Sequence, residues 1–305
     1  MHIALIDLGT ASVRFEVYAV LRRSDGHVIR ERLHQERSMP RLGEGLYETR
    51  RLNVAAKEKL LQLFRHYKQK LEDWNVQHVF AVATSAIREA DDAPEFITSL
   101  EEAGGFPVSI ISGEEEASLI AKGILANESD LPAKFGLVDI GGGSTEISVC
   151  KNRNVDVSLS LPLGAIRSHQ VYLKQSPPDK ESTAALRNTI RQTLAVSGLA
   201  GSCPVSLLIG SSGTTRTLIG LEIQHSLPKG FLSRADLHAL VKVMTPMNVQ
   251  ELRAIPGMEE NRADILLAGA IVLEELADFL EADTIRATSF SLRHGLLEHA
   301  ISALP

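Results

Sequence analysis

A glycine-rich segment with an acid at each end, residues 139–146, is the strongest chemical pattern in the sequence. It reads Asp139, Ile140, Gly141, Gly142, Gly143, Ser144, Thr145 and Glu146. Consecutive glycines let the backbone approach a ligand closely and point several N–H groups at it. The two hydroxyl side chains add further donors, so the segment is predicted to cradle an anion.

The two acids of this segment suit a phosphate only together with a cation. Asp139 and Glu146 carry negative charge, which would repel a bare phosphate group. Mg²⁺, or another hard divalent cation such as Mn²⁺, resolves the conflict when it lies between carboxylates and phosphate oxygens. The alternative is a hairpin with a capped glycine turn and no ligand.

Residues 5–12 repeat the pattern near the start of the chain. Both copies have an apolar run, an Asp, a glycine-containing turn, a Ser and a second apolar run, which predicts two strands joined by a tight turn. Asp7 is a candidate metal ligand here, and Gly9, Thr10 and Ser12 are candidate phosphate ligands. The repeat indicates a duplicated domain that opens each time with the same hairpin.

Two segments place further polar residues where a predicted strand gives way to a helix. Arg88 closes residues 83–88 and could bind phosphate oxygens with two hydrogen bonds. Glu114, Glu115 and Glu116 open a helix, where acids complement the helix dipole and one of them could take a proton from water. The spacing does not choose among the three.

A second glycine turn spans residues 208–215. Gly210, Ser212, Gly213 and Thr214 are candidates to hold further phosphates or a nucleotide sugar. A plain capped turn is the alternative.

Strands alternate with helices along the chain. Helices are predicted over residues 54–74, 92–103, 114–125, 180–194, 235–244, 263–280 and 292–303, and single strands over 79–83, 108–111, 158–163, 206–209 and 284–287. This alternation predicts an α/β fold with mixed sheets under helical cover. The polar stretch at 126–132 is the predicted domain boundary.

Length and composition limit the possible functions. The 305 residues suggest two domains. The 38 acids exceed the 32 Lys and Arg, and a formal net charge of −6 argues against nucleic acid as a partner. Cys150 and Cys203 make neither a disulfide framework nor a zinc ribbon. The N-terminus lacks a basic leader and the apolar run at 265–273 is short for a bilayer, so we expect a cytoplasmic protein without membrane contact.

From Ile3 to about Leu297 the chain resembles the exopolyphosphatase/guanosine pentaphosphate phosphatase (Ppx/GppA) family of the actin-like ATPase clan. The carrying segments are residues 81–88, 111–113, 115–117, 138–146, 160–167 and 261–264. Each is moderately specific, and all of them in this order are highly specific. The resemblance implies two actin-like (ribonuclease H-like) domains, 1–125 and 126–305, with the active site in the cleft between them. The helix at about 292–305 is a candidate to pack back on the first domain.

The resemblance also implies an activity, namely Mg²⁺-dependent hydrolysis of the terminal phosphoanhydride of inorganic polyphosphate. The family's general base falls on Glu116, its metal-binding and water-positioning acids on Asp139 and Glu146, its hairpin acid on Asp7 and its basic pocket residue on Arg88. Guanosine pentaphosphate is the alternative substrate, and a homodimer is expected by resemblance only.

Two residues depart from the family pattern: Ala11 stands where Asn is frequent, and His294 where Glu is frequent. Many relatives continue into further helical domains after the point where this sequence stops, so we expect a preference for shorter polyphosphate. A non-catalytic polyphosphate or alarmone sensor and a sugar kinase of the same clan are further alternatives. The full set of acids argues against the sensor, and residues 115–117 argue against the kinase.

Overall fold

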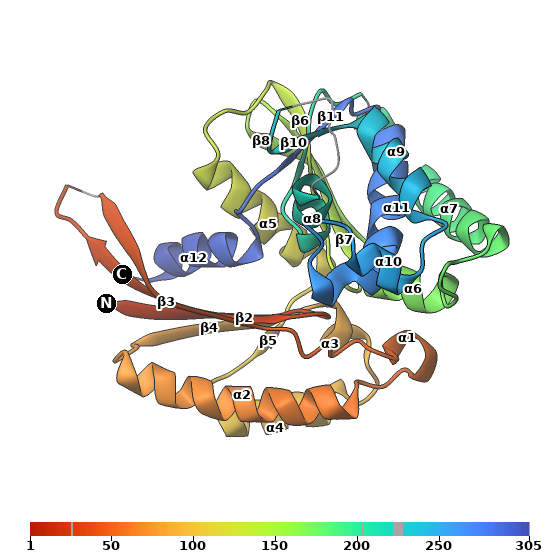
Figure 1. Cartoon of the computed structure of the whole chain (residues 1–305). Helices are drawn as coiled ribbons and strands as arrows, with labels where there is room; N and C mark the ends of the chain where they lie inside the picture. The colour runs from red at the N-terminus through yellow and green to blue at the C-terminus, as the bar shows by residue number, and fades with distance from the viewer. Residues whose placement is uncertain (26, 203, 222–227, 305) are drawn as a thin grey trace. The chain divides into compact units, whose positions relative to one another are not determined.

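The structure is a computed structural model that describes residues 1–25, 27–202, 204–221 and 228–304, so Cys203 lies outside the described residues. The chain divides into two compact units (Figure 1). The first contains Met1–Ala126 and Leu292–Pro305, and the second contains Asn127–Ser291. The functional domains predicted at 1–125 and 126–305 stay a prediction.

The first unit is one five-stranded sheet with helices on its faces, in the strand order β3-β2-β1-β4-β5. Its elements are β1 (His2–Leu8), β2 (Val13–Arg22), β3 (Val28–Ser38), α1 (Leu46–Thr49), α2 (Val54–Asp73), β4 (His78–Ala83), α3 (Ser85–Glu89), α4 (Ala93–Gly104), β5 (Ser109–Ile110), α5 (Gly113–Asn127) and α12 (Leu292–Ala303).

Helices α2 and α4 cover one face of this sheet (Figure 1). The apolar side chains of α2 recur at helical spacing, and the helix starts at Asn53, whose side chain accepts a hydrogen bond from the Ala56 N–H at 2.9 Å. Phe15 from β2 stacks on Tyr67 from α2 with 4.6 Å between ring centroids. This core fixes the strands whose ends carry the first hairpin.

Helix α12 returns to the first unit and packs on the opposite face of the same sheet (Figure 1). A methyl group on Gly295 would overlap the carbonyl oxygen of Leu119, so α12 and α5 meet backbone to backbone. The Arg22 guanidinium donates to the carbonyl of Ile301 at 2.7 Å. The last helix therefore holds α5 against the sheet.

The second unit is a six-stranded sheet in the order β10-β11-β9-β6-β7-β8. Its elements are β6 (Lys134–Ile140), β7 (Thr145–Lys151), β8 (Asn154–Leu161), α6 (Ala165–Tyr172), α7 (Lys180–Ala195), η1 (Leu199–Ser202), β9 (Leu208–Gly210), α8 (Gly213–Gly220), β10 (Phe231–Ser233), α9 (Arg234–Met244), α10 (Val249–Arg253), η2 (Glu260–Arg262), α11 (Ala263–Phe279) and β11 (Thr284–Ala287). Helix α11 is buried almost all round, and its two buried acids, Glu274 and Glu275, pair with Arg187 and Arg191 of α7.

The two sheets share one topology. Three antiparallel strands in sequence order are followed by two strands that run parallel to the first of them: β1, β2, β3, β4 and β5 correspond to β6, β7, β8, β9 and β11. The predicted α/β class with mixed sheets and helical cover is therefore confirmed, and the sequence repeat is a repeat of structure.

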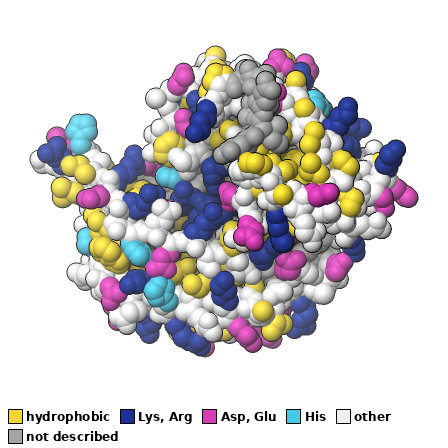
Figure 2. Space-filling view, viewed as in Figure 1, with side chains coloured by type: hydrophobic (Ala, Val, Ile, Leu, Met, Phe, Trp, Pro, Cys, Tyr) yellow, Lys and Arg dark blue, Asp and Glu magenta, His cyan; other side chains and the backbone are white. Residues whose placement is uncertain are grey.

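Two further properties of the structure concern the charges on its surface and the apolar character of its helices. Figure 2 shows acidic and basic side chains intermixed over one face, although the chain carries a formal net charge of −6. Among the described residues, none of the helices combines the length and the apolar character that crossing a bilayer requires.

Candidate active site

The second hairpin holds the two predicted acids side by side. Asp139 in β6 is directly opposite Glu146 in β7 in the antiparallel register. Directly opposed residues lie on one face with Cβ atoms roughly 5 Å apart, so the carboxylates share one patch of the sheet. Asp139 is half-buried and Glu146 is buried.

Two serines on neighbouring strands hold these carboxylates. The Ser160 hydroxyl on β8 donates to Glu146 Oε1 at 2.7 Å. The Ser211 hydroxyl, in the turn after β9, donates to Asp139 Oδ2. Neither serine was among the site residues predicted from the sequence. Ser160 lies in a segment that carries the family resemblance and Ser211 in the predicted glycine turn, but only the strand pairing brings them to the acids.

The glycine loop between β6 and β7 has its carbonyl groups turned toward helix α6. The Gly141 carbonyl accepts from the Ala165 N–H at 2.9 Å, the Gly142 carbonyl from the Ile166 N–H at 2.9 Å and the Gly143 carbonyl from the Gly164 N–H at 3.2 Å. The N–H groups of Gly142, Gly143 and Ser144 donate to no acceptor within the described part of the chain. Successive free N–H groups in a tight turn can form an anion-binding nest.

Gly164 allows this arrangement because a side chain there would overlap the Gly142 and Gly143 backbone. We expect Gly164→Ala to separate α6 from the loop and to destabilise the fold by about 1–3 kcal/mol, the usual range for overpacking. Thermal unfolding measures the loss. Gly220→Ala is the matched control, since a methyl group at Gly220 meets nothing within 4 Å. An unchanged melting temperature for Gly164→Ala would contradict the prediction.

The first hairpin has the same turn as the second, but different residues hold its carbonyl groups. The Gly9 N–H donates to the Ser12 carbonyl at 3.0 Å, as the Gly141 N–H does to the Ser144 carbonyl at 2.9 Å. The carbonyl groups of Thr10 and Ala11 are held by the N–H groups of Gly43 and Arg41, each at 3.0 Å.

The free N–H groups of the first hairpin belong to Thr10, Ala11 and Ser12, which donate to no acceptor in the ranges that the structure describes. Thr10 offers only its N–H group, because its side chain is buried against Gly43. Ala11 stands where the family often has Asn, so a side-chain contact is missing. The backbone N–H group of Ala11 is still present, so the row of free N–H groups is unchanged. Opposite Asp7 the strand pairing places Arg14, where the second hairpin has an acid.

The structure distinguishes the three acids at the start of α5. Glu115 and Ser112 form a capping pair: the Ser112 N–H donates to Glu115 Oε2 at 2.7 Å, and the Glu115 N–H donates to Ser112 Oγ at 3.1 Å. Hydrogen bonds from the Ser112 N–H and hydroxyl hold the pKa of Glu115 below its usual value. Glu114 is exposed, whereas Glu116 is buried.

Arg88 contacts the buried acid. Its Nη1 lies 3.4 Å from Glu116 Oε2 and donates to the Ile111 carbonyl at 2.8 Å. The guanidinium thus joins α3 to the start of α5 and fixes the Glu116 carboxylate beside a positive charge. The structure brings these two predicted site residues together.

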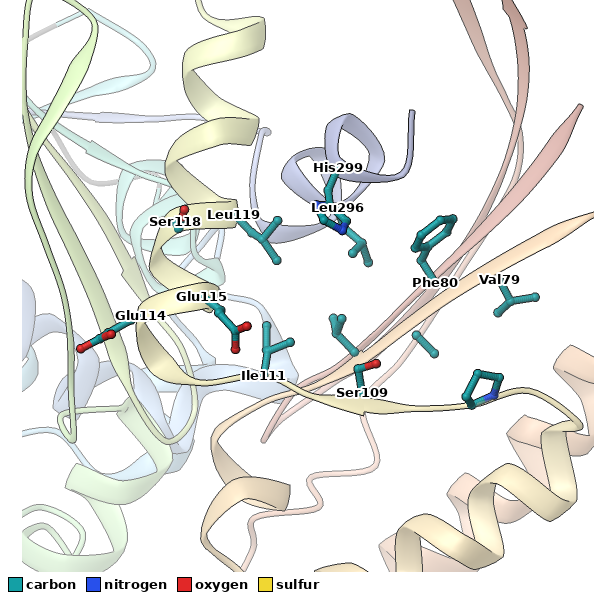
Figure 3. A pocket seen from close by; sticks show the side chains of 13 residues that line it. Val79, Phe80, Ser109, Ile111, Glu114, Glu115, Ser118, Leu119, Leu296 and His299 are labelled. Atoms are coloured by element: carbon teal, nitrogen blue, oxygen red, sulfur yellow. The ribbon is translucent and has the colours of Figure 1, made fainter. Parts of the chain in front are cut away.

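Glu114 and Glu115 line a different feature, a largely apolar pocket of about 550 Å³ in the first unit (Figure 3). Its walls come from β4, α5 and α12, with Phe80, Leu119 and Leu296 among them. In Figure 3 the Glu115 carboxylate turns toward this space. Glu116 does not line this pocket, so Glu114 and Glu115 face a different space from the one that Glu116 faces.

Several predicted phosphate ligands have structural partners instead. The Thr145 side chain is fully buried and its hydroxyl donates to the Leu163 carbonyl at 2.6 Å. Ser212 caps α8 by accepting from the Thr215 N–H at 3.2 Å. The Thr214 side chain is buried against Gly269. The structure therefore does not support phosphate binding by these three side chains.

The glycines of the same turn are explained by close packing. A methyl group on Gly210 would overlap the Thr215 side chain, and one on Gly213 would overlap the guanidinium of the buried Arg262. Residues 210–214 thus form a capped and closely packed turn, and their role in holding further phosphates or a nucleotide sugar stays a prediction.

The carboxylate pair fits a magnesium ion. Mg²⁺ in proteins typically uses one or two carboxylates together with water and phosphate oxygens. Asp139 and Glu146 supply two carboxylates at the ends of the strands that the glycine loop joins. In the described residues, His, Cys, Asp and Glu side chains form no group of three or more that could hold a metal.

Comparison with known proteins decides the family. The model of the Ppx/GppA phosphatase family matches residues 19–303. The chain belongs to this family. Members are phosphoanhydride hydrolases, and this chain is one of them. Exopolyphosphatase 2 of Mycobacterium tuberculosis is 31% identical over 293 residues, which cover 90% of each chain.

Two further relatives complete the comparison. The guanosine-5'-triphosphate,3'-diphosphate pyrophosphatase of Vibrio vulnificus is 28% identical over 99% of this chain, which spans 59% of that protein. The crystal structure of an exopolyphosphatase from Cytophaga hutchinsonii, 24% identical, has the same fold, with a TM-score of 0.87 over 100% of this chain and 99% of that one. The predicted actin-like architecture of this Ppx/GppA protein is therefore confirmed.

Proposed function

We propose that this Ppx/GppA protein hydrolyses the terminal phosphoanhydride of inorganic polyphosphate and releases orthophosphate. One observation carries the proposal: a nest of free N–H groups at Gly142, Gly143 and Ser144 lies beside the opposed carboxylates of Asp139 and Glu146. This pairing suits a phosphate that arrives with a divalent cation. The name of the Mycobacterium tuberculosis relative agrees with polyphosphate as the substrate.

The proposed mechanism assigns one task to each group. Glu116 takes a proton from water, the water oxygen bonds to the terminal phosphorus, and the bridging P–O bond breaks to leave a polyphosphate shorter by one unit. The loop N–H groups hold the oxygens of the transferred group, and Arg88 orients Glu116. Asp139 and Glu146 would hold Mg²⁺, which offsets the charge of the phosphate oxygens when bound.

The residues named in the proposed mechanism come from both units. Asp7, Arg88 and Glu116 belong to the first unit, whereas Asp139 and Glu146 belong to the second. Asp7 is a further candidate metal ligand from the first hairpin, on the strength of the repeated sequence pattern.

Guanosine pentaphosphate is the second candidate substrate, favoured by the name of the Vibrio vulnificus relative. We expect Mg²⁺-dependent orthophosphate release from polyphosphate to exceed release from guanosine pentaphosphate. Side-by-side assays of the two substrates, with and without a chelator, measure the difference. Faster release from the nucleotide would overturn the substrate assignment, and tight polyphosphate binding without any release would favour a sensor.

A further inference from the structure

Strand β3 lies at the edge of the first sheet (Figure 1). Its charged residues are separated by face. The pairing register with β2 places three arginines on one face and two glutamates on the other. The arginines are Arg30, Arg32 and Arg37, and the glutamates are Glu31 and Glu36. The glutamate face is the one covered by α2, because His66 of α2 hydrogen-bonds Glu36. The arginine face is therefore the one on which α12 packs.

This arrangement has a cost that the sheet itself does not explain. Arg37 lies directly opposite Arg14 of β2, and like charges directly opposed destabilise a strand pair. Charged side chains on an edge strand do prevent unwanted pairing, but either sign on either face serves that purpose. Local conflicts of this kind are expected where a protein binds something.

Helix α12 contacts this face through Glu298, which pairs with Arg30, and through the Ile301 carbonyl, which accepts from Arg22. Burial, and then the charges of Arg32, Arg14 and Arg30, lower the pKa of His294 to about 4. The imidazole is therefore neutral near pH 7 and lies within the field of arginines from two strands.

Acids on the same face offset only part of this charge. Glu16 pairs with Arg293 at 2.8 Å and lies 3.8 Å from Arg32, and Glu298 pairs with Arg30. The side chains of Arg30 and Arg32 remain 35% and 45% exposed even with these acids beside them, so a solvent-borne anion can reach both.

The arginines lead away from the first hairpin. Arg14 is opposite Asp7 at the hairpin end, Arg32 pairs with Tyr18 and Arg30 pairs with Val20. On β2, Tyr18 lies four residues beyond Arg14 and Val20 lies six residues beyond it. At the usual strand rise, the partners of Arg32 and Arg30 are therefore about 13 and 20 Å from Arg14. A row of that length suits a linear polyanion.

We propose that Arg30 and Arg32 form a distal subsite that holds phosphate groups of an extended polyphosphate, away from the phosphoanhydride that is cleaved. The inference rests on the proposed function, since it names where the rest of that substrate lies. Guanidinium groups bind phosphate oxygens through paired, charge-assisted hydrogen bonds. Tripolyphosphate is too short to reach Arg30 from the hairpin, so the subsite acts on longer chains only.

The test replaces both arginines, as Arg30→Gln with Arg32→Gln, and measures kcat and KM for long polyphosphate and for tripolyphosphate. We expect KM for long polyphosphate to rise about tenfold, the scale of one or two charge-assisted hydrogen bonds, with kcat unchanged and with tripolyphosphate unaffected. The matched control is Arg65→Gln, because Arg65 is exposed on α2 beneath the other face of the sheet.

The outcomes separate the two proposals. No change in KM, or an equal change for both substrates, overturns the distal subsite and leaves the proposed function standing. Absence of phosphate release from either substrate by the unchanged protein refutes the proposed function. In that case, calorimetric binding of long polyphosphate still decides the subsite: weaker binding by the double variant supports it, and equal binding overturns it.

Discussion

Glu116→Gln is expected to lower kcat for phosphate release by at least about a hundredfold, the usual scale for losing a general base. Glu116 is the buried acid of the three at the start of α5, and Arg88 lies 3.4 Å from its carboxylate. An amide in its place keeps the shape but cannot take a proton from water. KM should change much less than kcat. The substitution removes the proton transfer from water but leaves the loop N–H groups that hold the phosphate.

Glu114 and Glu115 supply matched controls on the same helical turn. Glu114→Gln alters an exposed side chain and should leave kcat as it is. Glu115→Gln replaces the carboxylate that accepts from the Ser112 N–H with a neutral amide, which is a weaker acceptor. We therefore expect a small loss of stability and near-normal turnover. Near-normal turnover in Glu116→Gln, or a large loss in Glu114→Gln, would move the base to another acid. Steady-state kinetics with thermal melting checks all three variants.

The elements that the sequence predicted well have local causes. The helix predicted at 292–303 is α12 (Leu292–Ala303), and the helix predicted at 54–74 is α2 (Val54–Asp73). Both hairpins were expected from an apolar run on either side of a glycine turn, and both are present. In these segments the apolar spacing and the turn residues act within a few positions of one another, so the printed sequence already contains the determinants.

The elements that were missed depend on distant partners. Strand β3 (Val28–Ser38) carries charge on both faces and has no buried alternation, since it lies at the sheet edge and is defined only by its pairing with β2. Helix α6 (Ala165–Tyr172) starts at Gly164 without a side-chain cap. Its first N–H groups bind carbonyls of the glycine loop more than twenty residues earlier, so its start signal is tertiary.

The site shows the same division. The glycine loop, Asp139 and Glu146 were recognisable as a pattern because they are contiguous in the sequence. The serines that hold the acids were not, because Ser160 and Ser211 reach them through strand pairing. Burial likewise singles out Glu116 from its neighbours, whereas the spacing of three consecutive acids left that choice open.

Asp139→Asn is expected to lower kcat/KM at fixed Mg²⁺ by at least about a hundredfold, since charge stabilisation by a bound metal is worth several kcal/mol. Asn keeps one oxygen and loses the negative charge that would hold the ion beside Glu146. The Mg²⁺ concentration for half-maximal activity should rise as well, which a purely structural defect would not cause. A titration of activity against Mg²⁺ measures both quantities.

Ser160→Ala gives a graded version of the same test. Its hydroxyl donates to Glu146 Oε1 at 2.7 Å, and losing such an outer contact typically weakens metal affinity by about 10–100-fold. Ser158→Ala is the matched control: Ser158 lies two residues earlier on β8, and its hydroxyl bonds Ser148 at 2.9 Å and touches neither acid. If Asp139→Asn leaves the Mg²⁺ response unchanged, or if Ser158→Ala shifts it as much as Ser160→Ala, then this face of the sheet does not hold the metal and the carboxylate pair has another purpose.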